Sequence, residues 1–279
     1  MDSVRVLITN DDGIRAPGIQ ALREALVGID GVDVEVVAPD SNRSATARSI
    51  TTHSPLWVEE VPFPDGTTGF ATDGTPVDCV RIAELGLVEE RPELIVSGIN
   101  HGVNLGDDVT YSGTVAAALE GVVLGIPAIA LSQQANRGSL GFAEGPREFD
   151  FTFAANLAAE LVRSALKNPL TPGTLINVNV PAGEVDGIEV TKLGKREYDD
   201  KLEWLEDGPD GRRRYRIYGI DPGHRDEPGT DLAAVARHRA SLTPLHFDLT
   251  AHHSIESLRQ MDLESIFRNT LAAGGVKAG

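Results

Sequence analysis

The stretch that decides the fold is Val4–Gln20, VRVLITNDDGIRAPGIQ. It begins as an apolar run with β-branched residues, which indicates a strand, and it restarts at Pro17 with apolar residues at helical spacing. Proline is favourable at the first position of a helix because the N–H it lacks would have no partner there. Asp11 and Asp12 therefore lie in the turn between a first strand and a first helix. In open α/β sheets, ligands bind at this carboxyl edge of the strands.

Two adjacent carboxylates repel each other unless a cation or a proton lies between them. The pair formed by Asp11 and Asp12 indicates a hard divalent metal, Mg²⁺, Mn²⁺ or Ca²⁺, held by oxygen ligands. A turn with solvated carboxylates explains the same residues, because Asp-Gly is common in turns. This stretch by itself leaves both interpretations open.

Strands and helices alternate along the chain as far as residue 186. After the first strand, the pattern predicts strands at Val32–Val37, Leu56–Val61, Leu94–Gly98, Pro127–Ser132 and Leu175–Val180. It predicts helices that begin at Pro17 and Thr75 and that cover Thr114–Leu124 and Phe149–Leu166. This alternation is typical of βαβ units and predicts a Rossmann-like three-layer α/β/α core with a mostly parallel sheet over residues 1–186.

The pattern changes at Gly187. Strands are predicted at Ile188–Leu193, Arg213–Tyr218 and Leu242–Leu249, separated by turns rich in Gly, Pro and Asp rather than by helices. A terminal helix with an apolar face is predicted over Ser254–Leu271. Residues 187–279 are therefore expected to form a β-rich extension and a C-terminal helix, an oligomerisation arm within what is overall a single domain.

The composition is strongly acidic. The 279 residues carry a net charge of −17, from 42 acidic and 25 basic residues. This charge argues against stable nucleic-acid binding, since such binding depends on basic residues that neutralise phosphates. An acid-rich, lysine-poor chain suggests a halophilic organism with a salty cytosol, where a Debye length of about 3 Å at 1 M salt screens the self-repulsion.

The expected location is the cytoplasm. The N-terminus has no secretory signal, and no apolar run is long enough to span a membrane. Cys79 is the single cysteine, which excludes an intrachain disulfide and fits a reducing compartment. A buried small hydrophobic residue explains Cys79 better than a catalytic thiol does.

Three polar loops follow separate strands: Asp11–Asp12, Asn42–Ser44 and Ser97–Gly113. In a doubly wound sheet they converge on one edge. Asn100 can then add a neutral oxygen ligand beside the two carboxylates, and Ser44 can add a hydroxyl. A solvated loop position is the simplest interpretation of His101.

Ser112, Gly113 and Thr114 open a predicted helix, whose unpaired N–H groups can bind a phosphate. Plain helix capping explains the same three residues. With a metal next to these amides, the chemistry that fits is metal-assisted hydrolysis of a phosphate ester, in which Asp11 or Asp12 accepts the proton of the attacking water. The sequence has no GxxxxGK[ST], no GxGxxG after the first strand and no GxSxG, so other common nucleotide and hydrolase motifs are absent.

Several blocks carry a family resemblance: NDDG (10–13), APGI (16–19), APDSNRS (38–44), GTPVDCV (74–80), SGINHGVNLGDDVTYSGTVAAALEG (97–121) and GIPAIALS (125–132). In this order they resemble the SurE survival-protein family. The resemblance implies a metal-dependent 5′/3′-nucleotidase that hydrolyses nucleoside monophosphates. Where the family continues NRS with glycine, this chain has Ala45, and Thr46–Arg48 also differ from the family's run of small residues.

The resemblance assigns site residues and partners. It implies one divalent cation per subunit, Mg²⁺ or Mn²⁺, held by Asp11, Asp12, Ser44 and Asn100. Asp11, Asp12 and Asn100 are also the predicted catalytic residues. The predicted substrate pocket contains Asn42, Gly106, Asp107, Ser112, Gly113 and Thr114. The C-terminal arms are expected to pair subunits into a homodimer or homotetramer.

The sequence thus predicts a cytosolic phosphatase of nucleoside 5′-monophosphates, with 3′-monophosphates as a further substrate class. Two alternatives remain at this point. One is a polyphosphate or sugar-phosphate phosphatase that uses the same site. The other is a nucleotide or anion sensor that binds without hydrolysis.

Overall fold

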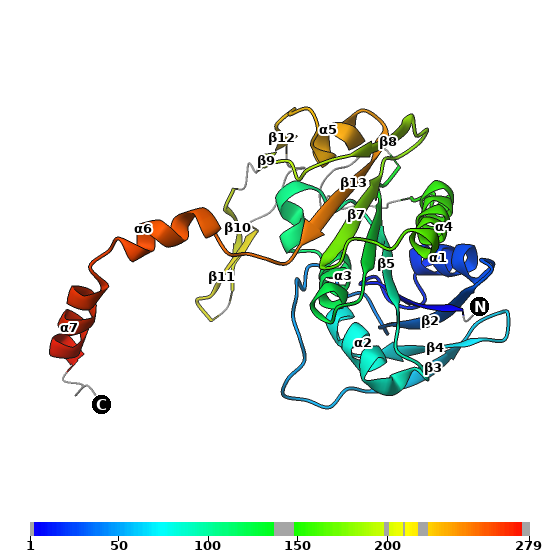
Figure 1. Cartoon of the computed structure of the whole chain (residues 1–279), viewed down its shortest axis with the longest axis horizontal. Coiled ribbons are helices and arrows are strands. Elements are labelled where there is room, and N and C mark those ends of the chain that lie inside the picture. Colours follow the sequence, from blue (N-terminus) through cyan, green and yellow to red (C-terminus); the bar gives the residue numbers. More distant parts are fainter. Residues whose placement is uncertain (1–2, 137–147, 198–200, 209, 217–222, 275–279) are drawn as a thin grey trace. The chain divides into compact units, whose positions relative to one another are not determined.

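The computed structural model describes residues 3–136, 148–197, 201–208, 210–216 and 223–274. The chain divides into two compact units, Met1–Phe247 and Asp248–Gly279. The first unit is built on a nine-stranded sheet with the strand order β3-β4-β2-β1-β5-β6-β7-β13-β8 (Figure 1). The predicted α/β fold with a mostly parallel sheet is confirmed.

The strands of this sheet are β1 (Val4–Thr9), β2 (Val32–Pro39), β3 (Val58–Pro62), β4 (Thr68–Thr72), β5 (Leu94–His101), β6 (Ala128–Gln133), β7 (Thr174–Val180), β8 (Gly187–Val190) and β13 (Arg239–His246). The central strands, from β4 through β2, β1, β5 and β6 to β7, are parallel. The pairs β3–β4 and β7–β13 are antiparallel. The sequence analysis did not predict β4. A Cβ on Gly69 of this strand would lie only 2.8 Å from the Phe63 ring.

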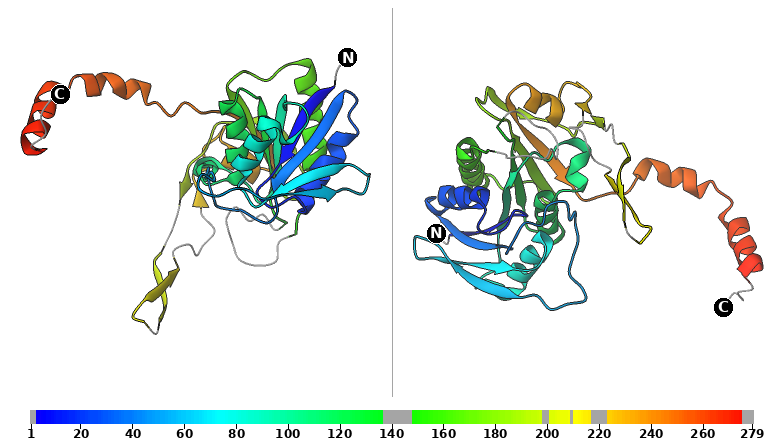
Figure 2. Two further views of the ribbon diagram at one scale, coloured as in Figure 1. Left: turned by 90° about the horizontal axis from the view of Figure 1, so that it is seen from below. Right: turned by 180° about the vertical axis from the view of Figure 1, so that it is seen from behind.

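Helices cover both faces of the sheet, as the two further views in Figure 2 also show. They are α1 (Pro17–Val27), α2 (Pro76–Ile82), α3 (Gly113–Val123) and α4 (Thr152–Lys167), and a short turn of helix over Ala83–Leu87 continues α2. The apolar sides of α1 and α4 pack in one core, and those of α2 and α3 pack in a second core on the opposite face. The sheet is therefore the middle layer of three.

Small residues let α3 approach the sheet closely. Ala117 and Ala118 are fully buried, and a Cβ on Gly121 would lie 2.5 Å from the Ile95 side chain. Because α3 is packed this tightly against β5, its two ends are held firmly relative to the strands. This matters for the site, because α3 begins next to Asp11.

The strand order places the crossover of the sheet beside β1. From β1 the chain moves to β2 on one side, and it later returns to β5 on the other side. Such a reversal opens a crevice at the carboxyl ends of the two strands, which is where ligands bind in this architecture. Asp11 and Asp12 follow β1, and Asn100 lies at the end of β5, so polar side chains lie on both sides of the crossover.

Part of the predicted extension belongs to the core. β13 joins the main sheet next to β7, and β8 pairs with β13 at the sheet edge, so the sheet continues past residue 186. The remaining short elements are β9 (Arg196–Glu197), β10 (Glu203–Asp207), β11 (Arg213–Arg216), β12 (Gly223–His224) and a short helix, α5 (Asp231–Ala236). The strand predicted over Arg213–Tyr218 is described only as far as Arg216.

Helix α5 was not predicted. It is short and its first five residues are all buried, so it gave no long helical period, yet Thr230 caps it by accepting a hydrogen bond from the backbone N–H of Ala233. The prediction of one terminal helix is also wrong, because the second unit contains α6 (Ile255–Arg259) and α7 (Leu263–Gly274) after a turn over His252–Ser254. Asp262 starts the new helix by accepting a hydrogen bond from the N–H of Ser265 at 2.9 Å.

Within the parts of the chain that the structure describes, every helix is too short or too polar to cross a membrane.

Candidate metal site

The turn after β1 is built around Asn10. Its side chain is fully buried, donates from Nδ2 to the carbonyl of Gly13 at 2.9 Å and accepts the N–H of Gly13 at 3.2 Å. Gly13 has φ +104°, which favours glycine, and a Cβ there would lie 3.3 Å from the backbone of Ser41. These bonds fix the backbone on both sides of Asp11 and Asp12.

Asp11 is buried against the start of α3. Its side chain accepts a hydrogen bond from the Thr114 hydroxyl at 2.6 Å, and a Cβ on Gly113 would lie 2.8 Å from Asp11 Oδ2. Burial and, second, the charge of Asp12 raise the pKa of Asp11 to about 6. The start of α3 therefore orients the Asp11 carboxylate, while burial and the neighbouring charge of Asp12 disfavour its ionised form.

Asp12 is held by the ends of two other loops. Its Oδ2 accepts the backbone N–H of His101 at 3.0 Å, and its Oδ1 accepts from Asn42 Nδ2 at 3.2 Å. The side chain is only 6% exposed. Both carboxylates are thus held in position by hydrogen bonds.

Asn42 links the carboxylates to Ser44. While Asn42 Nδ2 donates to Asp12, its Oδ1 accepts the backbone N–H of Ser44 at 2.9 Å. The same loop is tied to the first turn by a bond from the N–H of Arg43 to the carbonyl of Asp11 at 2.7 Å. The structure therefore brings Asp11, Asp12 and the Ser44 loop together, although no described contact joins the Ser44 hydroxyl directly to either carboxylate.

Asn100 offers an acceptor at the end of β5. Its Nδ2 donates to the carbonyl of Gly102 at 2.9 Å, which orients the side-chain amide and leaves Oδ1 as the acceptor. The residue that follows, His101, is the one whose N–H binds Asp12. Asn100 therefore directly precedes the residue whose backbone N–H binds Asp12.

The donor set fits a hard dication. Oxygen ligands suit Mg²⁺, Mn²⁺ and Ca²⁺, and two buried carboxylates whose charges repel gain most from a positive ion. No arginine or lysine in the described part of the chain forms an ion pair with Asp11. The described residues also contain no group of three or more His, Cys, Asp or Glu that could hold a metal, so a metal here needs neutral oxygens as well.

The predicted pocket residues of the third loop divide into two sets. Thr114 and Gly113 contact Asp11, whereas Ser112 caps α3 by accepting the N–H of Val115 at 3.1 Å. The capping interpretation of Ser112 is therefore confirmed. Its role in a substrate pocket stays a prediction.

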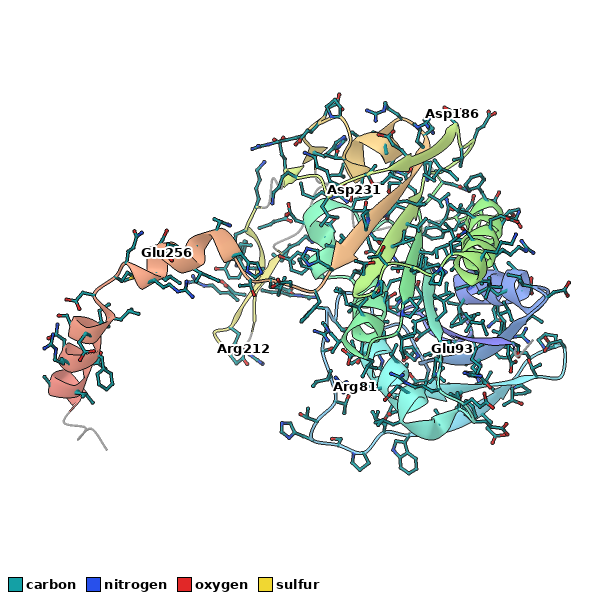
Figure 3. All side chains as sticks on the ribbon, viewed as in Figure 1. Arg81, Glu93, Asp186, Arg212, Asp231 and Glu256 are labelled. Atoms are coloured by element: carbon teal, nitrogen blue, oxygen red, sulfur yellow. The ribbon has the colours of Figure 1, made fainter. Side chains whose placement is uncertain are left out.

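Gly106 and Asp107 contact a different part of the chain. The N–H of Gly106 donates to Asp231, the first residue of α5, at 2.8 Å (Asp231 is labelled in Figure 3). Asp107 accepts hydrogen bonds from Lys195 Nζ and from the N–H of Arg196. None of these contacts joins the two residues to the carboxylates, so their place in the substrate pocket remains a prediction.

The interpretation of His101 as a solvated loop residue is wrong. Its ring packs on Phe149 and Phe151, with ring centroids 5.1 and 5.2 Å apart. Burial lowers the pKa of His101, while the charge of Asp11 opposes this shift. The sequence analysis missed the two phenylalanines because it placed Phe149 inside a helix, whereas α4 begins at Thr152. Cys79 is buried and free, as expected.

Comparisons with known proteins identify relatives of this chain. A family model described as "Survival protein SurE" matches residues 6–200. The chain is 49% identical over 264 residues to a protein of Rubrobacter xylanophilus named 5′-nucleotidase SurE, covering 93% of this chain and 98% of the relative. A protein of Geobacter sulfurreducens with the same name is 47% identical over 269 residues, covering 94% and 95%.

A solved structure shows the same fold. The crystal structure of the SurE protein from Aquifex aeolicus matches with a TM-score of 0.76 and 39% sequence identity. The match covers 91% of this chain and 98% of the Aquifex chain.

Proposed function

This chain belongs to the SurE survival-protein family and is a 5′-nucleotidase, a phosphatase of nucleoside monophosphates, and we propose that it acts with one divalent cation held by Asp11, Asp12, Ser44 and Asn100. The observation that carries the proposal is the buried pair Asp11–Asp12 at the crossover of the sheet. Mg²⁺ and Mn²⁺ are the cations proposed, because the donors are all oxygens.

The residues around the pair have separate tasks in this proposal. Thr114 and the N–H of His101 hold Asp11 and Asp12 in position, and Asn42 keeps the Ser44 loop beside them. When bound, the dication would neutralise the carboxylates and polarise the phosphoryl group of the substrate. A carboxylate oxygen of Asp11 or Asp12 would accept the proton of the attacking water.

The phosphate is proposed to lie at the start of α3. Backbone N–H groups at the N-terminus of an eleven-residue helix attract anions, and the first turn of this helix contacts Asp11 through Thr114. In a protein of net charge −17, a dication and these amides supply the local positive field that a phosphate ester requires. Ser112, Gly113, Thr114 and Asn42 are the residues proposed to contact the substrate there.

A substrate panel tests the function and its alternative. With Mn²⁺ present, we expect phosphate release from AMP and other nucleoside 5′-monophosphates, slower release from 3′-monophosphates, and loss of all release after chelation. Polyphosphate and sugar phosphates serve as the comparison substrates. A higher kcat/KM for either of them than for every nucleotide would favour the alternative of a polyphosphate or sugar-phosphate phosphatase.

We further propose a homodimer in the cytoplasm, paired through the C-terminal arms, with no stable nucleic-acid partner. The second unit supports this, because Leu258, Leu263, Ile266 and Phe267 are all about half exposed on its two helices. Apolar side chains at helical spacing indicate a face that another surface covers. A monomeric mass for the intact chain in sedimentation experiments would contradict the dimer.

The acid-rich composition supports adaptation to a salty cytosol. With 42 acidic residues and 25 basic ones, repulsion at low salt destabilises the folded chain. We expect the free energy of unfolding to rise between 50 mM and molar KCl, measured by chemical denaturation. Equal stability at both concentrations would count against a halophilic origin.

A further inference from the structure

A buried carboxylate joins the Ser44 loop to the helix that contacts Asp11. Glu120 on α3 is 1% exposed, and its Oε2 accepts a hydrogen bond from Arg48 Nη2 at 2.5 Å. Its other oxygen pairs with Arg81 of α2 at 2.6 Å (Arg81 is labelled in Figure 3). A buried carboxylate with two arginine partners is an anchor that is costly to leave half-paired.

Arg48 is also held from its other side. Its guanidinium carbon lies 4.5 Å from the centre of the Phe247 ring, at the end of β13. Stacking on an aromatic face limits the conformations of an arginine side chain. The guanidinium is consequently held by two contacts, one with Glu120 and one with Phe247, although Arg48 itself belongs to a loop.

That loop has an unusual backbone. Ala45 and Ala47 have φ values of 59° and 51°, in the left-handed region that residues with a Cβ avoid. Such conformations persist where the surroundings determine them. Upstream, Ser44 is bonded to Asn42 and Thr46 to the carbonyl of Arg43. Downstream, Arg48 contacts the buried carboxylate of Glu120.

Helix α3 connects the two halves of the proposed metal site. Thr114 in its first turn binds Asp11, and Glu120, six residues later, binds Arg48. At 1.5 Å per residue the two attachment points are about 9 Å apart along the axis. One tightly packed helix therefore sets the position of the Ser44 loop relative to the carboxylates.

We propose that Arg48 is a positioning residue: through Glu120 it holds the strained Ser44 loop against α3, so that Ser44 faces the carboxylate pair in the geometry that a dication requires. The inference rests on the proposed metal site. Arg48 is one of the positions at which this chain differs from the family's run of small residues, and the proposal gives that difference a function.

The chain contains a matched control for this inference. Arg81 pairs with the same carboxylate, carries the same charge and lies on α2 instead of the loop. Arg48→Ala and Arg81→Ala each leave Glu120 with one arginine, so both are expected to lower the thermal unfolding temperature. Only Arg48→Ala removes a contact that the Ser44 loop makes with α3.

The test measures Mn²⁺ binding to the metal-free intact protein by calorimetry, together with the unfolding temperature. Arg48→Ala is expected to weaken Mn²⁺ binding about tenfold or more, the usual effect of losing a group that orients a metal ligand. Arg81→Ala is expected to leave the affinity unchanged. Arg48→Lys keeps a cation within reach of Glu120 and is expected to restore most of the affinity.

The outcomes separate this inference from the proposed function. If Arg48→Ala and Arg81→Ala change the Mn²⁺ affinity equally, or if neither changes it, the positioning role is wrong while the metal site stands. If the wild-type protein binds no Mn²⁺, or Asp11→Asn binds it as tightly as the wild type, the metal site is wrong and the role of Arg48 falls with it.

Discussion

Asp11→Asn is expected to lower kcat/KM for AMP by about a thousandfold and to abolish Mn²⁺ binding, because it removes one of the two charged ligands. The substitution keeps the size of the side chain, and its remaining carbonyl oxygen can still accept the hydrogen bond that Thr114 donates to Asp11. What it removes is the negative charge. Phosphate release and calorimetric Mn²⁺ titration measure the two effects separately.

Asp11→Asn is expected to remain folded in the absence of metal. Burial and the charge of Asp12 raise the pKa of Asp11 from 3.8 to about 6, so the metal-free wild type loses stability as the pH rises through this range. The wild type loses about 3 kcal/mol of folding stability at most above pH 6. The asparagine of the variant is neutral at every pH, so the variant does not lose this stability. Asp11→Asn should therefore unfold at a higher temperature than the metal-free wild type at pH 7 and at a similar temperature at pH 4.

Asp33→Asn provides the matched control. Asp33 is exposed and lies opposite Arg5 in the register of β1 and β2, at their amino ends and away from the site, and the charge change is the same. Full turnover is expected for this variant. Full turnover by Asp11→Asn would instead exclude the proposed metal chemistry.

Gly113→Ala is expected to reduce kcat/KM by about a hundredfold, the effect of misplacing a catalytic group by about 1 Å. Alanine suits the first turn of a helix, so helix α3 should still form. Its Cβ, however, would lie 2.8 Å from both Cβ and Oδ2 of Asp11. The buried carboxylate must then move away from Thr114 and from its position beside Asp12.

The measurements for Gly113→Ala are kcat/KM for AMP and the affinity for Mn²⁺. Gly28→Ala, at the end of α1, adds the same methyl group where no atom lies within 4 Å, and it should leave both values unchanged. Wild-type activity in Gly113→Ala would show that the contact between α3 and Asp11 has no part in the reaction.

Local signals in the sequence were strong enough to determine the core elements. The β-branched run of β1, Pro17 at the start of α1, and the capping box of Thr75 and Asp78 at the start of α2 each act within a few residues. Such signals are readable because their physical cause is local: backbone sterics and unpaired N–H groups at helix ends. The position of Asp11 and Asp12 after β1 was predictable for the same reason.

The sequence did less well where contacts are distant in the chain. It gave no sign that Asp107 would bind Lys195, or that the ring of His101 would pack on Phe149 and Phe151. It also placed the end of the core at residue 186, although β13 completes the sheet beside β7. In each case the partner lies dozens of residues away, where no periodicity links the two positions.

By itself, then, the sequence determined the strand–turn–helix that carries Asp11 and Asp12, since each part is specified by neighbouring residues. Only the tertiary structure decided that Asn42 bridges Asp12 to the Ser44 loop and that Arg48 reaches Glu120. The physical reason is that hydrogen bonds and ion pairs between loops depend on the order and spacing of the strands below them, which the packing of the whole sheet sets.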